Sequence, residues 1–176
     1  FLVTLGGDTA GVRAELEISP YDGDGSDALT LEVLDNKALW KDAGAKAWSP
    51  AAPNLYRVVF VLRENGGLIV DKLESYAGVR TIETRAGRVY LNGEDFYQKL
   101  LLDQGYFPGG IYAPADDAIM RADCEMYKRM GFNGLRKHQK IEDPRFLYWC
   151  DRLGLVVWEE MPSTMGIGSA KVVENW

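Results

Sequence analysis

The residues best suited to chemistry stand in three short stretches, each directly after an apolar run. Asp103 follows "KLLL", the stretch Arg136 to Gln139 follows "FNGL", and the pair Glu159 and Glu160 follows "LVVW". A guanidinium at a strand end can hold a carboxylate through charge-assisted hydrogen bonds, and carboxyl groups can transfer protons. These stretches are therefore the candidates for a ligand-binding or acid–base site.

Glu159 and Glu160 look like an acid–base pair, but their adjacency argues against that interpretation. Neighbouring residues on a strand point to opposite faces, so the two carboxyls cannot both flank one bond. We expect one of them to enter the site and the other to be paired or solvated.

His138 is the only histidine of the chain and lies in its most basic stretch, "LRKHQK". Because side chains alternate along a strand, Arg136 and His138 share one face. Lys137 and Gln139 share the other. One interpretation directs Arg136 and His138 into the site. The alternative is a solvated basic loop in which His138 has no special role, and the spacing alone leaves both open.

The elements that would position these residues occupy the second half of the chain. Periodicity and end signals predict a hairpin in "RVYLNGEDFY", strands ending near residues 103, 138 and 160, helices over 114–130 and 143–154, and a further helix in "AKVVENW". This order of strands and helices indicates parallel strands joined by crossover helices. Ligands bind at the carboxyl ends of such strands, where the candidate residues stand.

The two central helices carry recognisable end signals. Asp143 is a candidate N-cap, Pro144 a first helical residue and Gly154 a stop. In the helix over 114–130, helical spacing predicts this apolar stripe: Ile119, Ala122, Met126, Tyr127 and Met130. A barrel takes eight parallel strands and only three are recognised here. The chain also begins without methionine, so we expect it to be cut from a longer protein at both ends.

The first half of the chain alternates apolar and polar residues with the period of a strand. The stretches "VRAELEIS" and "LTLEV" place their apolar residues on one face, and "YRVVFVLR" places Tyr56, Val58, Phe60 and Leu62 on one face. Short strands with turn signals at this spacing predict an antiparallel β-sandwich. The loop "YDGDGSD" lacks the glycine and glutamate that an EF-hand needs at its sixth and twelfth positions, which favours a solvated hairpin loop over a calcium site.

Composition argues against several classes of partner. The chain has 176 residues, a formal net charge of −6 and no apolar run long enough for a membrane span. An acidic surface repels phosphate groups, so neither nucleic acid nor a membrane is expected as a partner. Cys124 and Cys150 lack zinc spacing and are predicted to be buried thiols, and no glycine-rich phosphate loop follows a strand. No metal or cofactor is therefore expected, while a homo-oligomer stays open.

Five stretches, in order, resemble landmarks of glycoside hydrolase family 2, the β-galactosidase, β-mannosidase and β-glucuronidase group. They are "WSPAAPNLY", "GVRTIE", "YLNGEDF", "MGFNGLR" and "FLYWCDRLGLVVWEE". The resemblance implies a multi-domain chain. Residues 1–84 would be an immunoglobulin-like antiparallel β-sandwich, and residues 85–176 would be the first β/α units of an incomplete (β/α)8 TIM barrel.

The resemblance also implies a function, a retaining exo-β-glycosidase that is β-galactosidase-like and hydrolyses O-glycosyl bonds in carbohydrates. The family's acid/base and nucleophile glutamates lie on later barrel strands and neither motif occurs here, so no catalytic residue is assigned and the chain alone is expected to be inactive. Arg136 and Glu160 match polar residues at the floor of the family's site.

The expected substrate-binding set has four members: Arg136, His138, Glu160 and Asp103. Galactosidase-like members have histidine where Gln139 stands, so the usual galactose-recognition set is not fully present. The alternative function is a non-catalytic β-sandwich module that binds carbohydrate or a protein partner.

Overall fold

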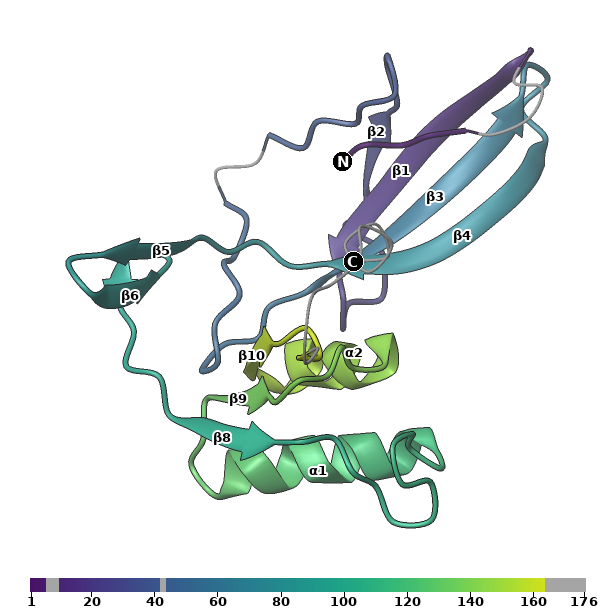
Figure 1. Cartoon of the computed structure of the whole chain (residues 1–176). Coiled ribbons are helices and arrows are strands. Elements are labelled where there is room, and N and C mark those ends of the chain that lie inside the picture. The colour runs from purple at the N-terminus through teal and green to yellow at the C-terminus, as the bar shows by residue number, and fades with distance from the viewer. Residues whose placement is uncertain (6–9, 42–43, 164–176) are drawn as a thin grey trace, which may run out of the picture. The chain divides into compact units, whose positions relative to one another are not determined.

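The structure is a computed structural model that describes residues 1–5, 10–41 and 44–163. The chain divides into two compact units, Phe1–Phe96 and Tyr97–Trp176 (Figure 1). The helix expected in "AKVVENW" lies outside the described residues. Within the described part, no helix is both long and apolar enough to cross a membrane.

The main sheet of the first unit is antiparallel and has four strands. Its order is β2-β1-β3-β4, with β1 at Val12–Pro20, β2 at Leu29–Glu32, β3 at Tyr56–Glu64 and β4 at Ile69–Ala77. The stretch "YDGDGSD" forms the loop between the antiparallel strands β1 and β2, where Asp24 accepts a hydrogen bond from the Ser26 amide. The β-rich, antiparallel character predicted for the first half is confirmed, whereas the sandwich stays a prediction.

One face of this sheet carries a core cluster of the first unit, while Val59 and Val61 of β3 are buried on its other face. Leu16 and Ile18 of β1 and Val58 of β3 are buried and pack with Val3 and Ala38. Leu16 and Ile18 lie two residues apart, so the strand period correctly predicts their common face.

A small three-stranded sheet completes the first unit, with β5 at Ile82–Arg85, β6 at Arg88–Leu91 and β7 at Glu94–Asp95. Asn92 and Gly93 have φ angles of 53° and 82°, which confirms the predicted two-residue hairpin turn. The Asn92 side chain also donates to the Trp48 carbonyl at 3.0 Å, so the turn is tied to the first unit. The unit therefore ends at Phe96, after this hairpin, while the predicted domain boundary at residue 84 precedes it and stays a prediction.

The second unit contains a three-stranded parallel sheet in the order β10-β9-β8. The chain runs through β8 at Leu100–Asp103, α1 at Asp117–Arg129, β9 at Gly134–Lys137, α2 at Pro144–Leu153 and β10 at Val156–Glu159. The ends of α2 are as predicted. Asp143 accepts from the Arg145 amide at 2.9 Å, Pro144 is the first residue, and Gly154 has a left-handed φ of 76°.

Both helices cover the same face of this sheet. Leu135 of β9 is buried in one cluster with side chains from both helices: Met120, Cys124 and Tyr127 of α1 and Phe146 and Cys150 of α2. The predicted α1 stripe was partly wrong, because Ala122, Met126 and Met130 are exposed.

Cys124 and Cys150 are buried, as predicted, with their Sγ atoms 3.7 Å apart. Burial raises the pKa of the Cys150 thiol well above its usual range. A neutral buried thiol behaves as a small apolar side chain, so the two cysteines serve the core between α1 and α2.

Candidate functional site

Three of the predicted site residues meet at the carboxyl end of the parallel sheet. Arg136 lies on β9 and Glu160 directly follows β10, and Arg136 Nε donates to Glu160 Oε1. His138 Nδ1 lies 3.1 Å from Glu160 Oε2, and the Gln139 amide donates to the same oxygen at 3.2 Å. We call Arg136, His138 and Glu160 the exposed cluster.

The exposed cluster holds an ionised carboxylate that solvent can reach. The hydrogen bond from Arg136 lowers the pKa of Glu160, and the Gln139 amide and His138 act in the same direction. The side chain of Arg136 is 49% exposed, and those of His138 and Glu160 are about a third exposed. Hydrogen-bond donors of both basic side chains therefore stand beside an acceptor, which suits a ligand rich in hydroxyl groups.

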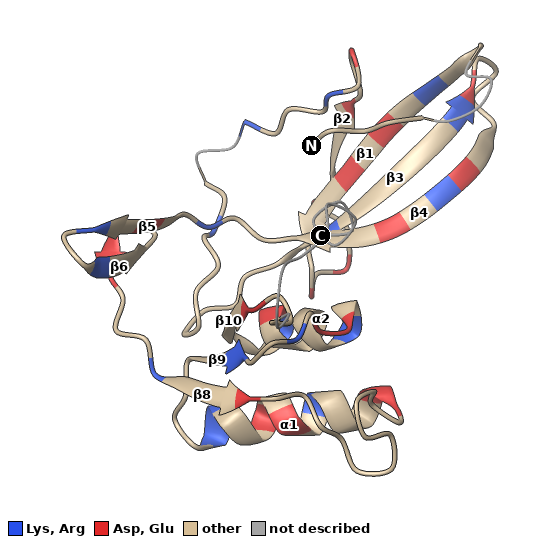
Figure 2. Cartoon of the chain, in the orientation of Figure 1, with Lys and Arg blue, Asp and Glu red and all other residues tan. Residues whose placement is uncertain are grey.

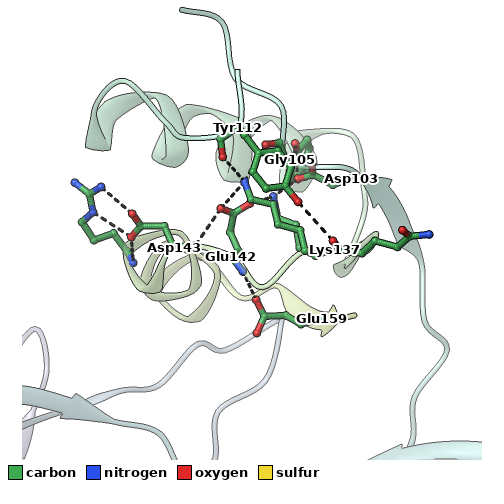
Figure 3. A network of polar contacts seen from close by, with 11 residues as sticks. Asp103, Gly105, Tyr112, Lys137, Glu142, Asp143 and Glu159 are labelled. Carbon is green, nitrogen blue, oxygen red and sulfur yellow. Dashed lines mark hydrogen bonds and ion pairs between the residues drawn. The ribbon is translucent and has the colours of Figure 1, made fainter. Parts of the chain in front are cut away.

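A second polar network lies on the helix-covered face of the same sheet (Figure 3). Lys137 is fully buried, and its Nζ lies 2.7 Å from Asp103 Oδ2 and 2.6 Å from Glu142 Oε2. Lys140 Nζ lies 2.9 Å from Glu142 Oε1. We call Asp103, Lys137, Lys140 and Glu142 the buried network. Each of its charges has an opposite charge beside it, which offsets the cost of removing these groups from water.

The buried network joins the carboxyl ends of all three strands. Lys140 Nζ donates to the carbonyls of Gly105 and Tyr112, both at 2.9 Å, so it holds the loop that follows β8. The Glu142 amide donates to Glu159 Oε1 at 2.8 Å, which adds the end of β10. The network thus fixes the loops that surround the exposed cluster.

Gly105 and Tyr127 complete the surroundings of Asp103. The Gly105 amide donates to Asp103 Oδ1 at 2.6 Å, and the Tyr127 hydroxyl donates to Oδ2 at 3.3 Å. Burial, with the Asp103 charge nearby, raises the pKa of Tyr127 and keeps its hydroxyl protonated as a donor. A Cβ at Gly105 would lie 2.5 Å from Lys140 Cδ, and the φ of Gly105 is +70°, so this position requires glycine.

The predicted site residues thus separate into two groups. Arg136, His138 and Glu160 come together, whereas Asp103 belongs to the buried network. The expected divergence of the two glutamates is confirmed, because Glu159 binds the Glu142 amide while Glu160 binds Arg136. The substrate-binding role of the four residues stays a prediction.

Sequence reasoning missed the rest of the buried network. Lys137 was placed on the face opposite Arg136 and His138 but was given no role, and neither were Lys140 and Glu142, although Lys137 lies two residues after the buried Leu135. That spacing was the available signal, since it places Lys137 on the core face of β9.

Among the residues that the structure describes in the first unit, the charged side chains form no comparable site. Acidic and basic residues follow one another along β1, β3 and β4 (Figure 2). Arg57 binds Glu74 at 2.6 Å, and Arg63 binds Glu15 at 2.8 Å. The Arg57–Glu74 pair is exposed and contributes little to stability, whereas the Arg63–Glu15 pair is partly buried and joins β3 to β1.

Comparison with known proteins identifies the family. Residues 3–80 match the model of glycosyl hydrolases family 2. The chain belongs to this family. A β-galactosidase of Thermoanaerobacter pseudethanolicus is 36% identical over 134 residues, which cover 73% of this chain and 17% of that protein. A β-galactosidase of Vibrio cholerae is 30% identical over 136 residues, covering 73% of this chain and 13% of that protein.

Solved structures of family 2 enzymes share the fold. A β-glucuronidase of Bifidobacterium dentium, complexed with coumarin-3-O-glucuronide, matches with a TM-score of 0.75 at 26% identity, covering 90% of this chain and 26% of that one. The apo structure of β-glucuronidase 3 of Bacteroides uniformis matches with a TM-score of 0.73 at 28% identity, covering 90% of this chain and 20% of that one. The chain spans only 11–17% of the length of its curated relatives.

Proposed function

We propose that the natural protein is a retaining exo-β-glycosidase, β-galactosidase-like, and that this chain supplies part of it. Residues 1–84 would be the immunoglobulin-like sandwich and residues 85–176 the opening of a (β/α)8 barrel. The observation that carries the proposal is the exposed cluster, which stands at the carboxyl ends of parallel strands in a family 2 chain. Carbohydrate is then the partner, because the related proteins are named as galactosidases and glucuronidases.

The arrangement of the second unit supports a barrel over an open doubly wound sheet. Consecutive strands are neighbours, all are parallel, and both helices cover one face. A doubly wound sheet has helices on both faces, whereas barrel strands keep one face toward the barrel interior. Leu102, Arg136 and Trp158 are paired across the three strands and exposed on the other face, which suits that interior.

Within the barrel, we propose that Arg136, His138 and Glu160 contact the substrate. The ionised Glu160 would accept from sugar hydroxyls, and Arg136 would donate to the ligand while it orients Glu160. The geometry favours Asp103 least among the predicted residues, since its two oxygens accept from Gly105, Lys137 and Tyr127.

We propose that the described residues supply no acid–base pair for retaining hydrolysis. That mechanism needs two carboxyls about 5 Å apart on opposite sides of the bond, one of them a proton donor with a raised pKa. Glu159 and Glu160 diverge, and the pKa of Glu160 is lowered rather than raised. We therefore propose that later barrel strands supply both groups and that this chain alone is inactive.

An activity assay on two materials tests this proposal. The natural protein should hydrolyse at least one member of a panel of nitrophenyl β-galactoside, β-glucuronide and β-mannoside. A sample of this chain, confirmed at 19.7 kDa by mass spectrometry, should hydrolyse none. If the natural protein binds sugars but hydrolyses no member of the panel, the alternative holds, a non-catalytic module that binds carbohydrate.

A further inference from the structure

The loop that follows β8 presents two exposed tyrosines in a fixed arrangement. Phe107 and Ile111 exchange two backbone hydrogen bonds, at 2.8 and 3.0 Å, which fold the loop into a narrow hairpin. Tyr106 and Tyr112 flank this bridge, with ring centroids 5.7 Å apart and an angle of 62° between the rings. They are 63% and 49% exposed, so a ligand can reach both.

Two buried side chains hold this hairpin in place. Phe107 is buried and packs against Phe146 of α2, with ring centroids 6.4 Å apart. The buried Lys140 donates to the Tyr112 carbonyl at 2.9 Å, and its Nζ lies 4.4 Å from the centre of the Tyr112 ring. Rings that are already held in place lose less conformational entropy when a ligand packs on them.

Gln139 links the tyrosine pair to the exposed cluster through its backbone. The Tyr112 hydroxyl donates to the Gln139 carbonyl at 3.5 Å, and the Gln139 amide donates to Glu160 Oε2 at 3.2 Å. A continuous surface therefore runs from aromatic rings to an ionised carboxylate and a guanidinium.

We propose that Tyr106 and Tyr112 form an aromatic edge on which a pyranose ring of the carbohydrate ligand stacks. A pyranose has C–H groups that pack on aromatic rings and hydroxyls that need donors and acceptors, and the two parts of this surface match those needs. The inference rests on the proposed function, because the ligand is the carbohydrate that the exposed cluster would bind. Lys140 is a positioning residue, since it acts through Tyr112.

Binding measurements on the natural protein test the aromatic edge separately from catalysis. The probes are methyl β-D-galactopyranoside, methyl β-D-glucuronide and methyl β-D-mannopyranoside. Saturation-transfer NMR detects their binding, and a titration gives the dissociation constant. Tyr106→Ala and Tyr112→Ala should each weaken binding of the preferred probe about fivefold to tenfold, whereas Tyr106→Phe and Tyr112→Phe keep the ring and stay within about twofold. Tyr97→Ala is the matched control, because Tyr97 is exposed in the same unit but precedes β8, at the opposite end of the strand.

Each outcome decides one point. Unchanged affinity in both alanine variants, an equal loss in Tyr97→Ala, or no binding of any probe by the wild type would overturn the aromatic edge. Hydrolysis of the nitrophenyl panel, measured in parallel, decides the proposed function. If the tyrosine variants weaken binding but the protein hydrolyses no substrate, the aromatic edge is supported and the glycosidase proposal is rejected. If the protein hydrolyses a substrate but neither tyrosine variant changes binding, the glycosidase proposal is supported and the aromatic edge is rejected.

Discussion

The exposed cluster and the buried network take their basic side chains from the same short stretch, residues 136–140, yet their environments are opposite. Arg136 and His138 point to the open face and share Glu160, while Lys137 and Lys140 enter the helix-covered side and share Glu142. The exposed contacts are reachable by a ligand and individually weak, whereas breaking a buried pair leaves a charge without compensation. A strand can thus carry solvent-accessible polar groups on one face and a buried supporting network on the other.

The largest expected effect comes from removing the buried lysine. Lys137→Met should lower the free energy of unfolding by about 3–5 kcal/mol, because Asp103 and Glu142 would keep buried charges without their shared partner. Urea unfolding followed by circular dichroism measures the change. Arg136→Ala, one residue away, should cost less than about 1 kcal/mol in the same assay.

The double variant Lys137→Met, Asp103→Asn sharpens this comparison. Removing the Asp103 charge should restore part of the lost stability, since the remaining charges, Lys140 and Glu142, are still paired at 2.9 Å. Equal costs for Lys137→Met and Arg136→Ala would show that the two faces do not differ as described.

The second prediction reverses the comparison by measuring activity instead of stability. In the natural protein, Arg136→Ala should lower kcat/KM more than tenfold with the melting temperature nearly unchanged, because losing a charged hydrogen bond costs about 1.5–3 kcal/mol. Arg121→Ala is the control, since Arg121 is an exposed helix residue paired with Glu125. Wild-type kinetics in Arg136→Ala would reject a substrate-binding role for the exposed cluster.

The third prediction separates backbone strain from crowding around the buried network. Gly105 and Gly109 both have a left-handed backbone, with φ of +70° and +78°, but only a Cβ at Gly105 would meet other atoms, Lys140 and Glu142. Gly109→Ala should cost about 1 kcal/mol of stability, and Gly105→Ala about 1–2 kcal/mol more. Chemical denaturation of both variants measures the difference in the free energy of unfolding. An equal loss in the two variants would mean that the loop moves to accommodate the Cβ at residue 105.

The sequence predicted correctly those turns and helix ends that depend on neighbouring residues alone. The Asn92-Gly93 turn and the Asp143, Pro144 and Gly154 ends of α2 were correct, because each depends on residues within one turn of the chain. The parallel strands also followed from period and order.

Features that depend on distant partners were not predictable in this way. The apolar residues of α1 fit more than one helical stripe, and only packing on β9 and α2 selects Met120 and Cys124 over Met126. No role was predicted for Lys137, since its burial depends on Asp103, which lies 34 residues earlier in the chain. The position of Tyr112 depends on Lys140, which donates to its carbonyl across 28 residues.

The smallest expected effect is a change in the titration of Glu160. The Arg136 hydrogen bond lowers the pKa of Glu160 below the usual 4.5, so the folded state favours the ionised carboxylate. The contribution of Glu160 to stability is therefore fully present above pH 4.5 and is lost as the pH falls through the lowered value, because the unfolded state binds the proton first. Carboxyl carbon NMR should place the Glu160 midpoint below 4.5, and Arg136→Gln should raise it toward that value. A midpoint that is the same in both proteins would show that Arg136 does not hold Glu160 in solution, and the exposed cluster would then lose the contact on which its proposed role depends.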